Sequence, residues 1–209
     1  MNKMIAVILA WCVLANGQNA SPIYRPAQVS SGGGYTDNFP GTSLSGNWTC
    51  YTAAGWGLPG VGSNSVFNSQ TSSVTSFCGY TGGTFGANQQ SKAVVGTNGG
   101  GSYPTQGVCI HVDPINGNGY CWQGFSGAGP QKVTAGVATA MGGYCGTAFT
   151  SGDTIKISNV GSTISVSKNG SSACSNVTDS TYTAGYPGFV FTLSSIFTIR
   201  ASFGSWAGQ

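Results

Sequence analysis

The sequence predicts an all-β protein folded as an antiparallel β-sandwich. Two runs, at residues 154–158 and 163–167, alternate apolar and polar side chains, which is the period of a strand buried on one face. Asn169-Gly170 directly follows the second run and favours the positive φ values of a type I′ hairpin turn. The other apolar runs are equally short and are separated by Gly- and Pro-rich turns, which is typical of a sandwich.

The expected elements follow one another along the chain without a repeat or a helical segment. We expect loops at residues 52–65 and 98–104, where Gly, Ala, Pro and Asn are frequent. The expected strands are residues 47–51, 66–67, 74–78, 89–95, a hairpin over 108–123, 132–139, a three-stranded meander over 154–177, 189–193 and 197–201.

The first twenty residues are typical of a secretory signal peptide. Lys3 precedes an apolar run at residues 4–15 that is too short to span a bilayer. Residues 21–34 are a Pro/Ser/Gly-rich linker, and residues 35–209 are expected to form a single β-sandwich domain. We therefore predict a secreted, extracellular protein with no membrane insertion after signal cleavage. A membrane-anchored N-terminus is the alternative, but no second apolar span supports it.

The composition narrows the classes of partner. Only 5% of the residues are charged, the formal net charge is +3, and Lys and Arg form no cluster, so the chain shows no nucleic-acid interface. With 40% hydrophobic residues a core can still form, and its surface must be covered by hydroxyls, amides and many of the 35 glycines. Such a surface repels little, which suits an extracellular protein and is compatible with self-assembly.

The cysteines predict disulfides. Removing Cys12 with the signal leaves six cysteines, for which fifteen connectivities exist. Cys109 and Cys121 would face each other if the hairpin between them folds symmetrically about Ile115. For the remaining four, the simplest nested pairs are Cys50–Cys78 and Cys145–Cys174. A metal site is the rival interpretation, but the chain has no C-x-x-C and one histidine.

Several motifs carry a family resemblance. GDTIKIS, ISVSKNG and VTDSTYTAGYPG, in this order between residues 152 and 188, resemble the closing strands of concanavalin A-like (laminin-G-like) jelly-roll domains of secreted bacterial and phage proteins. Asp37-Asn38-Phe39, with residues 46–49, resembles the opening of such lectin and glucanase domains. The likeness spans residues 35–203 and implies a concanavalin A-like jelly roll.

The same resemblance raises the question of bound Ca²⁺, which laminin-G-like relatives often hold on a rim. Asp113, Asn116 and Asn118 offer oxygen ligands, but their spacing is not that of an EF-hand loop. We expect no cofactor, with Ca²⁺ as the alternative.

The acidic residues argue against catalysis. Glucanases of the resembling group carry paired glutamates on one strand, and this chain has no glutamate. Its four acids occur in turn sequences, where an aspartate commonly binds its own backbone: Asp37, Asp113, Asp153 and Asp179.

His111, the one histidine, is no better placed as a base. Strand alternation puts Ile110, Val112, Tyr120 and Trp122 on the core face, so that Cys109, His111, Cys121 and Gln123 face the wetter side. No G-x-S-x-G elbow supplies a nucleophile. We therefore predict no catalytic residue and no enzyme activity.

Aromatic rings are the remaining signal for binding, because a sugar ring offers an apolar face and a ring of hydroxyls. Trp48 and Trp122 are expected in the core, whereas other rings lie in or beside Gly-rich loops. The candidate ligand-binding residues are Trp56, Tyr80, Tyr103, Tyr144, His111 and Gln123. For any single ring, anchoring its own loop is the simpler interpretation.

These features lead to two hypotheses. The first is a non-catalytic, lectin-like protein that binds a glycan or a cell-surface polysaccharide. The alternative is a structural subunit of an extracellular or virion surface assembly, which would use the same uncharged sandwich for packing.

Overall fold

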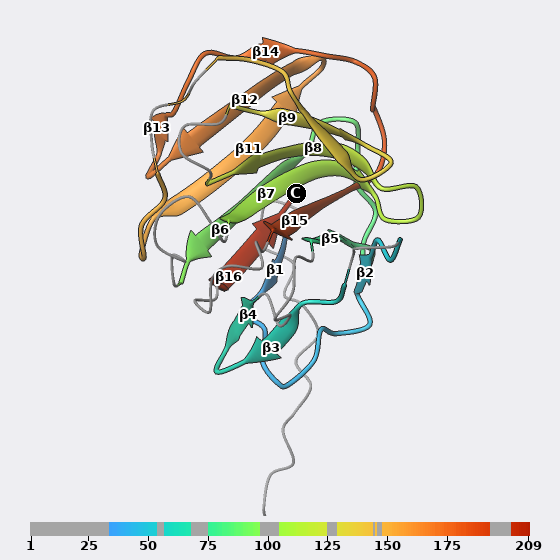
Figure 1. The fold of residues 1–209 in the computed structure, drawn as a ribbon, viewed down its shortest axis with the longest axis vertical. Helices are drawn as coiled ribbons and strands as arrows, with labels where there is room; N and C mark the ends of the chain where they lie inside the picture. Colours follow the sequence, from blue (N-terminus) through green and yellow to red (C-terminus); the bar gives the residue numbers. More distant parts are fainter. Residues whose placement is uncertain are drawn as a thin grey trace, which may run out of the picture.

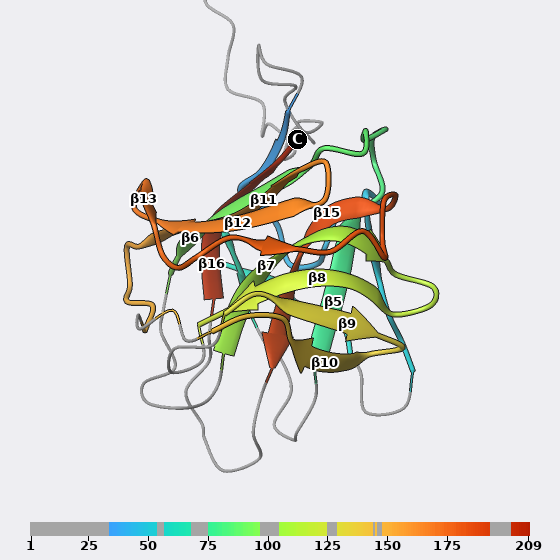
Figure 2. The ribbon, with the colours of Figure 1, turned by 90° about the horizontal axis from the view of Figure 1, so that it is seen from above.

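The computed structural model of the protein describes residues 34–53, 57–67, 75–96, 105–124, 129–143, 145, 148–192 and 202–209. Over these ranges the chain forms two antiparallel sheets stacked as layers, as Figure 2 shows. The regular elements of the described residues are all strands. This part of the chain therefore contains no helix that could cross a membrane. The predicted all-β antiparallel sandwich is confirmed. The predicted signal peptide and nearly all of the linker lie outside the described residues.

The first layer, sheet A, has nine strands in the described chain. Their order is β13-β12-β11-β6-β16-β4-β3, with β1 paired to β16 and β14 paired to β12 (Figure 1). The bounds are β1 Tyr35–Asp37, β3 Gly60–Gly62, β4 Ser65–Phe67, β6 Gln90–Val95, β11 Thr154–Val160, β12 Thr163–Lys168, β13 Ser171–Ser172, β14 Val177–Thr178 and β16 Ser202–Gly208.

The second layer, sheet B, has seven strands in the described chain, in the order β10-β9-β8-β7-β15-β5-β2. The bounds are β2 Trp48–Cys50, β5 Thr75–Tyr80, β7 Thr105–Asp113, β8 Asn118–Gln123, β9 Gln131–Thr134, β10 Val137–Ala140 and β15 Tyr186–Thr192.

The turns show where the sequence predictions succeed and where they fail. Asn169 and Gly170, with φ of 52° and 82°, turn β12 into β13 as predicted. The expected loop at residues 52–65 contains β3, and the expected third meander strand is present as the short β13 and β14. The single strand expected at 132–139 is wrong: Ala135 and Gly136, with φ of 48° and 82°, fold it into the β9–β10 hairpin. The strand expected at 197–201 lies outside the described residues.

Aromatic rings fill the space between the two sheets. The ring of Trp48 lies 4.7 Å from the ring of Phe189 and 4.7 Å from that of Trp206, measured between centroids. The Trp48 indole N–H donates to Asp37 Oδ2 at 2.8 Å, so the buried polar group of this ring is satisfied. Trp48 and Trp122 are both buried, which confirms their predicted place in the core.

A second apolar cluster covers the outer face of sheet B, so this sheet is buried on both sides. We call it the outer cluster. It consists of Phe77, Cys109, Val112, Cys121, Val133 and Val190, with Tyr51 packed against it. A strand that is buried on both faces no longer shows a clean alternation of apolar and polar residues.

A β-bulge in β7 connects the two clusters. The pairing of β7 with β8 slips between Ile110 and Asp113, and His111 lies in the slip with a φ of 52°. Beyond the bulge Val112 joins the outer cluster, whereas Ile110 belongs to the core between the sheets. The prediction that Ile110 and Val112 share one face is therefore wrong, because strict alternation assumes that no extra residue interrupts the strand.

Three disulfides connect the six cysteines of the described chain. Cys109 pairs with Cys121 across β7 and β8, in the register expected from a hairpin centred on Ile115. The other two pairs are Cys50–Cys78 and Cys145–Cys174, which confirms the nested pairing.

Mass spectrometry of the unreduced protein should show these three linked pairs and no free thiol. Replacing both Cys109 and Cys121 by Ala should lower the free energy of unfolding by about 2–4 kcal/mol, because the unfolded chain then loses a covalent loop. Chemical denaturation of the double variant measures this loss. Free thiols at both positions, or an unchanged midpoint, would contradict the prediction.

Candidate functional site

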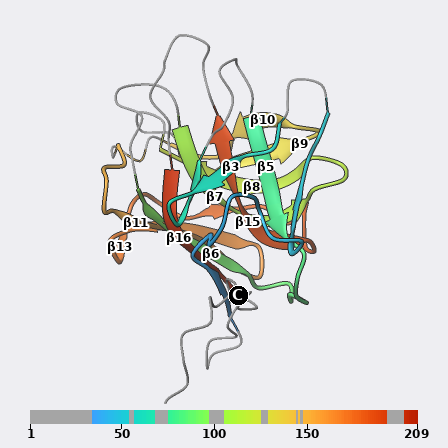
Figure 3. The same cartoon turned by 90° about the horizontal axis from the view of Figure 1, so that it is seen from below.

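The β9–β10 hairpin folds over the outer face of sheet B, so that less of this face is open to solvent. The Gly136 N–H donates to the carbonyl oxygen of Gly117 at 2.9 Å, and the Ala135 N–H donates to Asn118 Oδ1 at 2.9 Å. These bonds fix the tip of the hairpin to the turn between β7 and β8. In Figure 3, β10 lies beside β5, although the two strands are far apart in the strand order of the sheet.

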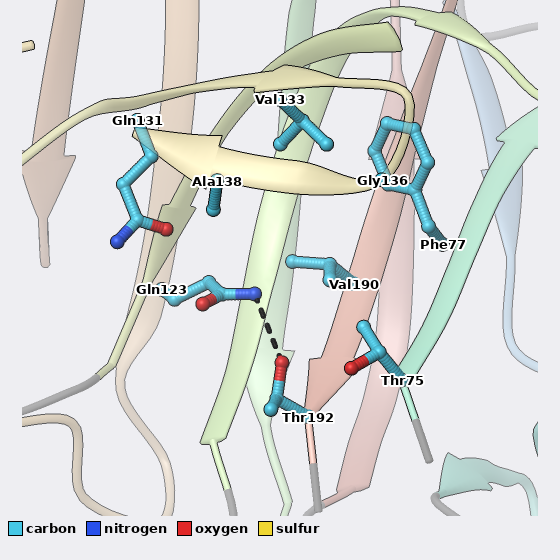
Figure 4. Close-up of a pocket in the computed structure, with 9 residues that line it drawn as sticks. All are labelled: Thr75, Phe77, Gln123, Gln131, Val133, Gly136, Ala138, Val190 and Thr192. Atoms are coloured by element: carbon cyan, nitrogen blue, oxygen red, sulfur yellow. Dashed lines mark hydrogen bonds between the residues drawn. The ribbon is translucent and has the colours of Figure 1, made fainter. Parts of the chain in front are cut away.

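A pocket of about 210 Å³ lies on this curled face (Figure 4). Residues from β5, β8, β9, β10 and β15 and from the hairpin tip contribute to it. The pocket is lined by Thr75, Phe77, Gln123, Gln131, Val133, Gly136, Ala138, Val190 and Thr192.

The lining divides into an apolar floor and a polar rim. Phe77, Val133 and Val190 form the floor and belong to the outer cluster. On the rim, Gln123 Nε2 donates to Thr192 Oγ1 at 3.3 Å. Gln131 Oε1 is buried and has no hydrogen-bond partner among the described residues. The pocket therefore offers a neutral ligand an apolar surface beside amide and hydroxyl groups.

Of the predicted ligand-binding residues, the structure places Gln123 in this pocket. Trp56, Tyr103 and Tyr144 lie outside the described residues, so their roles stay predictions. Tyr80 is only 1% exposed, and its ring stacks on that of Trp206 at 5.3 Å between centroids. The ligand contact predicted for Tyr80 does not fit this burial, because Tyr80 ends β5 with its side chain packed in the core between the sheets.

The sequence analysis missed Gln131, Thr75 and Thr192. Gln131 pairs with Cys121 across β8 and β9, so alternation would have placed it on the face of Gln123 had the start of β9 been known. For the two threonines the only signal is their position at a strand end beside an apolar run.

The four aspartates of the chain hold turns and strand ends. Asp153 accepts hydrogen bonds from Thr150 and Asn169 and pairs with Lys168 at 3.2 Å. Burial alone would raise the pKa of Asp153, but these donors outweigh it and lower the pKa to about 2. Asp113 accepts hydrogen bonds from the backbone N–H groups of Ile115 and Asn116. The predicted structural role of these acids agrees with the contacts, and no aspartate lines the pocket.

Asp179 ties β8 and β9 to the loop that precedes β15. It accepts hydrogen bonds from Tyr120 Oη at 2.6 Å and from the Thr181 N–H at 2.8 Å, and pairs with Lys132 at 3.0 Å. Burial raises and these donors lower the pKa of Asp179, with a net shift below its usual range. Burial and the bond to Asp179 raise the pKa of Tyr120 to about 12.

No metal site emerges from the described part of the chain. Nowhere in it do three His, Cys, Asp or Glu side chains come together in a way that could hold an ion.

Comparison with known proteins finds structural relatives only. No family model and no curated protein sequence matches the chain. The carbohydrate-binding module CBM66 from Bacillus subtilis is 14% identical with a TM-score of 0.53, over 78% of this chain and 92% of that chain. A β-1,3-1,4-glucanase (lichenase) from a mouse hindgut metagenome is 10% identical with a TM-score of 0.54, over 84% of this chain and 98% of that chain.

A third relative is the exoplasmic/lumenal domain of VIP36 in a Ca²⁺/Man3GlcNAc-bound form. It is 9% identical with a TM-score of 0.57, over 83% of this chain and 87% of that chain. At such identities the likeness shows the fold alone. These relatives are concanavalin A-like jelly-roll domains of the lectin and glucanase type, which confirms the fold that the sequence motifs imply.

His111 is enclosed where the β7 bulge faces sheet A. Its backbone N–H donates to Gln89 Oε1 at 2.9 Å, and its side chain is 1% exposed. Neither ring nitrogen has a well-formed hydrogen bond to any described residue, although the Asn159 side chain lies near the ring. Burial lowers the pKa of His111, and Asn159 opposes this shift only in part. The predicted wet position of His111 is therefore wrong: the imidazole is buried, and burial favours its neutral form.

The groups around His111 do not titrate near neutral pH. The ring of Tyr120 lies 6.1 Å from the imidazole, and the pKa of Tyr120 is raised to about 12. Asp179 behind it has a lowered pKa and stays ionised. On the side of sheet A, the polar neighbours are the uncharged Gln89 and Asn159.

Acidification should therefore destabilise the fold through His111. The unfolded chain binds the proton near the ordinary pKa of 6.5, whereas the folded chain binds it only at lower pH. The stability that this difference provides is complete above about pH 6.5 and is lost as the pH falls below it.

We expect the melting temperature of the wild type to fall between about pH 7.5 and about pH 5. His111→Asn should lose most of this dependence, because it removes the titrating ring while Asn tolerates a positive φ. Scanning fluorimetry or calorimetry across this range measures both. An equal pH slope in the two proteins would show that another group titrates.

Proposed function

We propose that this chain is a secreted, non-catalytic carbohydrate-binding protein and that the pocket on the curled face of sheet B is its binding site. The observation that carries the proposal is the chemistry of the lining. Phe77, Val133 and Val190 present a dry apolar floor, and Gln123 and Gln131 present amides beside it. A pyranose or furanose ring combines an apolar face with a rim of hydroxyls, and this lining suits both parts.

The structural relatives support the proposal at the level of ligand class. CBM66 is a carbohydrate-binding module, and the VIP36 domain is bound to Man3GlcNAc. Since the shared property of these proteins is fold, the choice of site rests on the residues of this chain.

The environment of the carboxylates does not support catalysis. Glycoside hydrolysis generally needs two carboxyl groups on opposite sides of the scissile bond. In this chain Asp153 and Asp179 are held by several donors and a lysine each, and their lowered pKa values leave neither as a general acid near neutral pH.

Secretion is argued from the signal-like N-terminus and from the disulfides. Three disulfides in the described chain indicate an oxidising compartment, outside the cell or in a lumen. Together with the apolar run at residues 4–15, this favours export.

A glycan array with the purified protein should identify a neutral glycan that binds saturably. For that glycan, Gln123→Leu should weaken binding by roughly three- to tenfold, since it removes one or two hydrogen bonds while keeping the side-chain volume. Titration calorimetry measures the loss, and the melting temperature should change little.

Gln90→Leu is the matched control. Gln90 lies on β6 of sheet A, and its side chain also makes an exposed amide hydrogen bond, to Gln209 Oε1 at 3.0 Å. Its loss should leave binding unchanged. Equal losses in both variants would count against the pocket, and hydrolysis of a β-glucan that an Asp→Asn variant abolishes would overturn the non-catalytic assignment.

One observation favours the structural-subunit alternative. β10 is one of the two edge strands of sheet B. All four of its residues are exposed, none is charged, and Val137 is 67% exposed. An uncharged edge strand can pair with another strand. If copies assemble in this way, the mass in analytical ultracentrifugation should rise with concentration and Val137→Lys should abolish the rise. A monomer at every concentration would exclude this assembly.

A further inference from the structure

We propose that the pocket accepts one neutral sugar residue at the end of a glycan, and not a run of residues inside a chain. This inference rests on the proposed carbohydrate-binding function and specifies the ligand of the same site.

The pocket is closed at its floor. Phe77, Val190 and Val133 are 0%, 2% and 4% exposed, so solvent does not pass between them. On the same face of the sheet, the outer cluster continues between β15 and β9 through the Cys109–Cys121 disulfide. A polymer that runs through a site needs an exit at both ends, whereas a blind pocket admits an end.

The β9–β10 hairpin closes one side of the pocket. β10 is one edge of sheet B and β5 is next to the other edge, yet Ala138 of β10 and Thr75 of β5 line the same pocket. Figure 4 shows side chains of both strands around one space. The bond from Gly136 to Gly117 holds the hairpin there. An extended chain lying across the sheet would have to pass through β10.

The pocket is also small. A volume of about 210 Å³ is below the range of roughly 300–1,000 Å³ that is usual for sites of drug-sized ligands. It has room for a single sugar ring, with the rest of the glycan outside.

The lining of the pocket is uncharged. None of the nine lining residues is ionisable. The nearest cation along β9, Lys132, is paired with Asp179 and bonded to Thr181. Gln131 Oε1 is a buried acceptor that no described residue satisfies, so it favours a hydroxyl donor and disfavours a carboxylate or sulfate. The terminal residue is therefore neutral.

The experiment uses the full secreted protein and titration calorimetry. The probes are the methyl glycosides of glucose, galactose, mannose, xylose and fructose, the matching linear oligosaccharides from disaccharide to hexasaccharide, and methyl glucuronide and galacturonide. For the sugar that binds, affinity per chain end should change by less than about threefold with chain length, because added residues lie outside the pocket. The matching uronide should bind at least about tenfold more weakly.

Two variants connect the result to the pocket. Ala138→Phe fills the space from an exposed strand position and should abolish binding, with a circular-dichroism spectrum like that of the wild type. Val160→Phe, on the exposed end of β11 in sheet A, adds the same ring elsewhere and should not affect binding.

The possible results distinguish end-on binding of a neutral sugar from the proposed carbohydrate binding as such. Affinity that rises more than about tenfold from disaccharide to hexasaccharide, or equal binding of the uronide, would overturn the end-on, neutral site while leaving carbohydrate binding in place. Binding that survives Ala138→Phe would also overturn it, because the sugar would then lie elsewhere. No binding of any probe or array glycan would instead refute the proposed function.

Discussion

The bulge at His111 is the constraint on which the candidate site depends. Gln89 accepts the backbone N–H of His111 and donates its own amide to the carbonyl oxygen of Gly185, at 2.9 and 2.8 Å, so the bulge is fixed from sheet A and from the loop before β15. Because the bulge advances the register, the following turn presents the Gly117 carbonyl and the Asn118 side chain to the β9–β10 hairpin. A hairpin held there curls the sheet, and the curl creates the pocket.

The same curl explains how an almost uncharged chain can form both a stable fold and a neutral pocket. Sheet B buries apolar residues on its two faces, so the floor of the pocket is part of the packed structure and does not depend on a ligand for its shape. Asp113, Asp153 and Asp179 bind the backbone of turns and strand ends, and none of them lines the pocket, which is therefore neutral. A rigid and uncharged site suits recognition by shape and by hydrogen bonds, and gives no electrostatic attraction over distance.

The sequence predicts those features of the fold and the pocket that depend on short, local patterns. The Asn169-Gly170 turn, the Cys109–Cys121 register and the jelly-roll fold depend on short patterns, and they were predictable. The bulge and the β9–β10 turn were not, because His111 and Ala135 adopt positive φ values that their residue types rarely take without tertiary support. Alternation assigned Gln123 to the outer face of its strand correctly, because Gln123 pairs with Gly107, in the part of β7 that comes before the bulge. Tyr80 was misplaced because a ring beside a Gly-rich loop can equally fill the space that the glycines leave.

A site of this kind limits its own affinity, and that limit connects the two functional hypotheses. A terminal hexose has roughly eleven non-hydrogen atoms. At about 0.3 kcal/mol for each atom, the efficiency of drug-sized ligands, its binding free energy is about 3–4 kcal/mol, which corresponds to a millimolar dissociation constant. Weak single sites retain a protein on a polysaccharide surface only when several act together. The uncharged edge of β10 offers a way to join copies, and each copy would bring one pocket to a surface with many chain ends. Self-association would then be a means of binding rather than a rival to it.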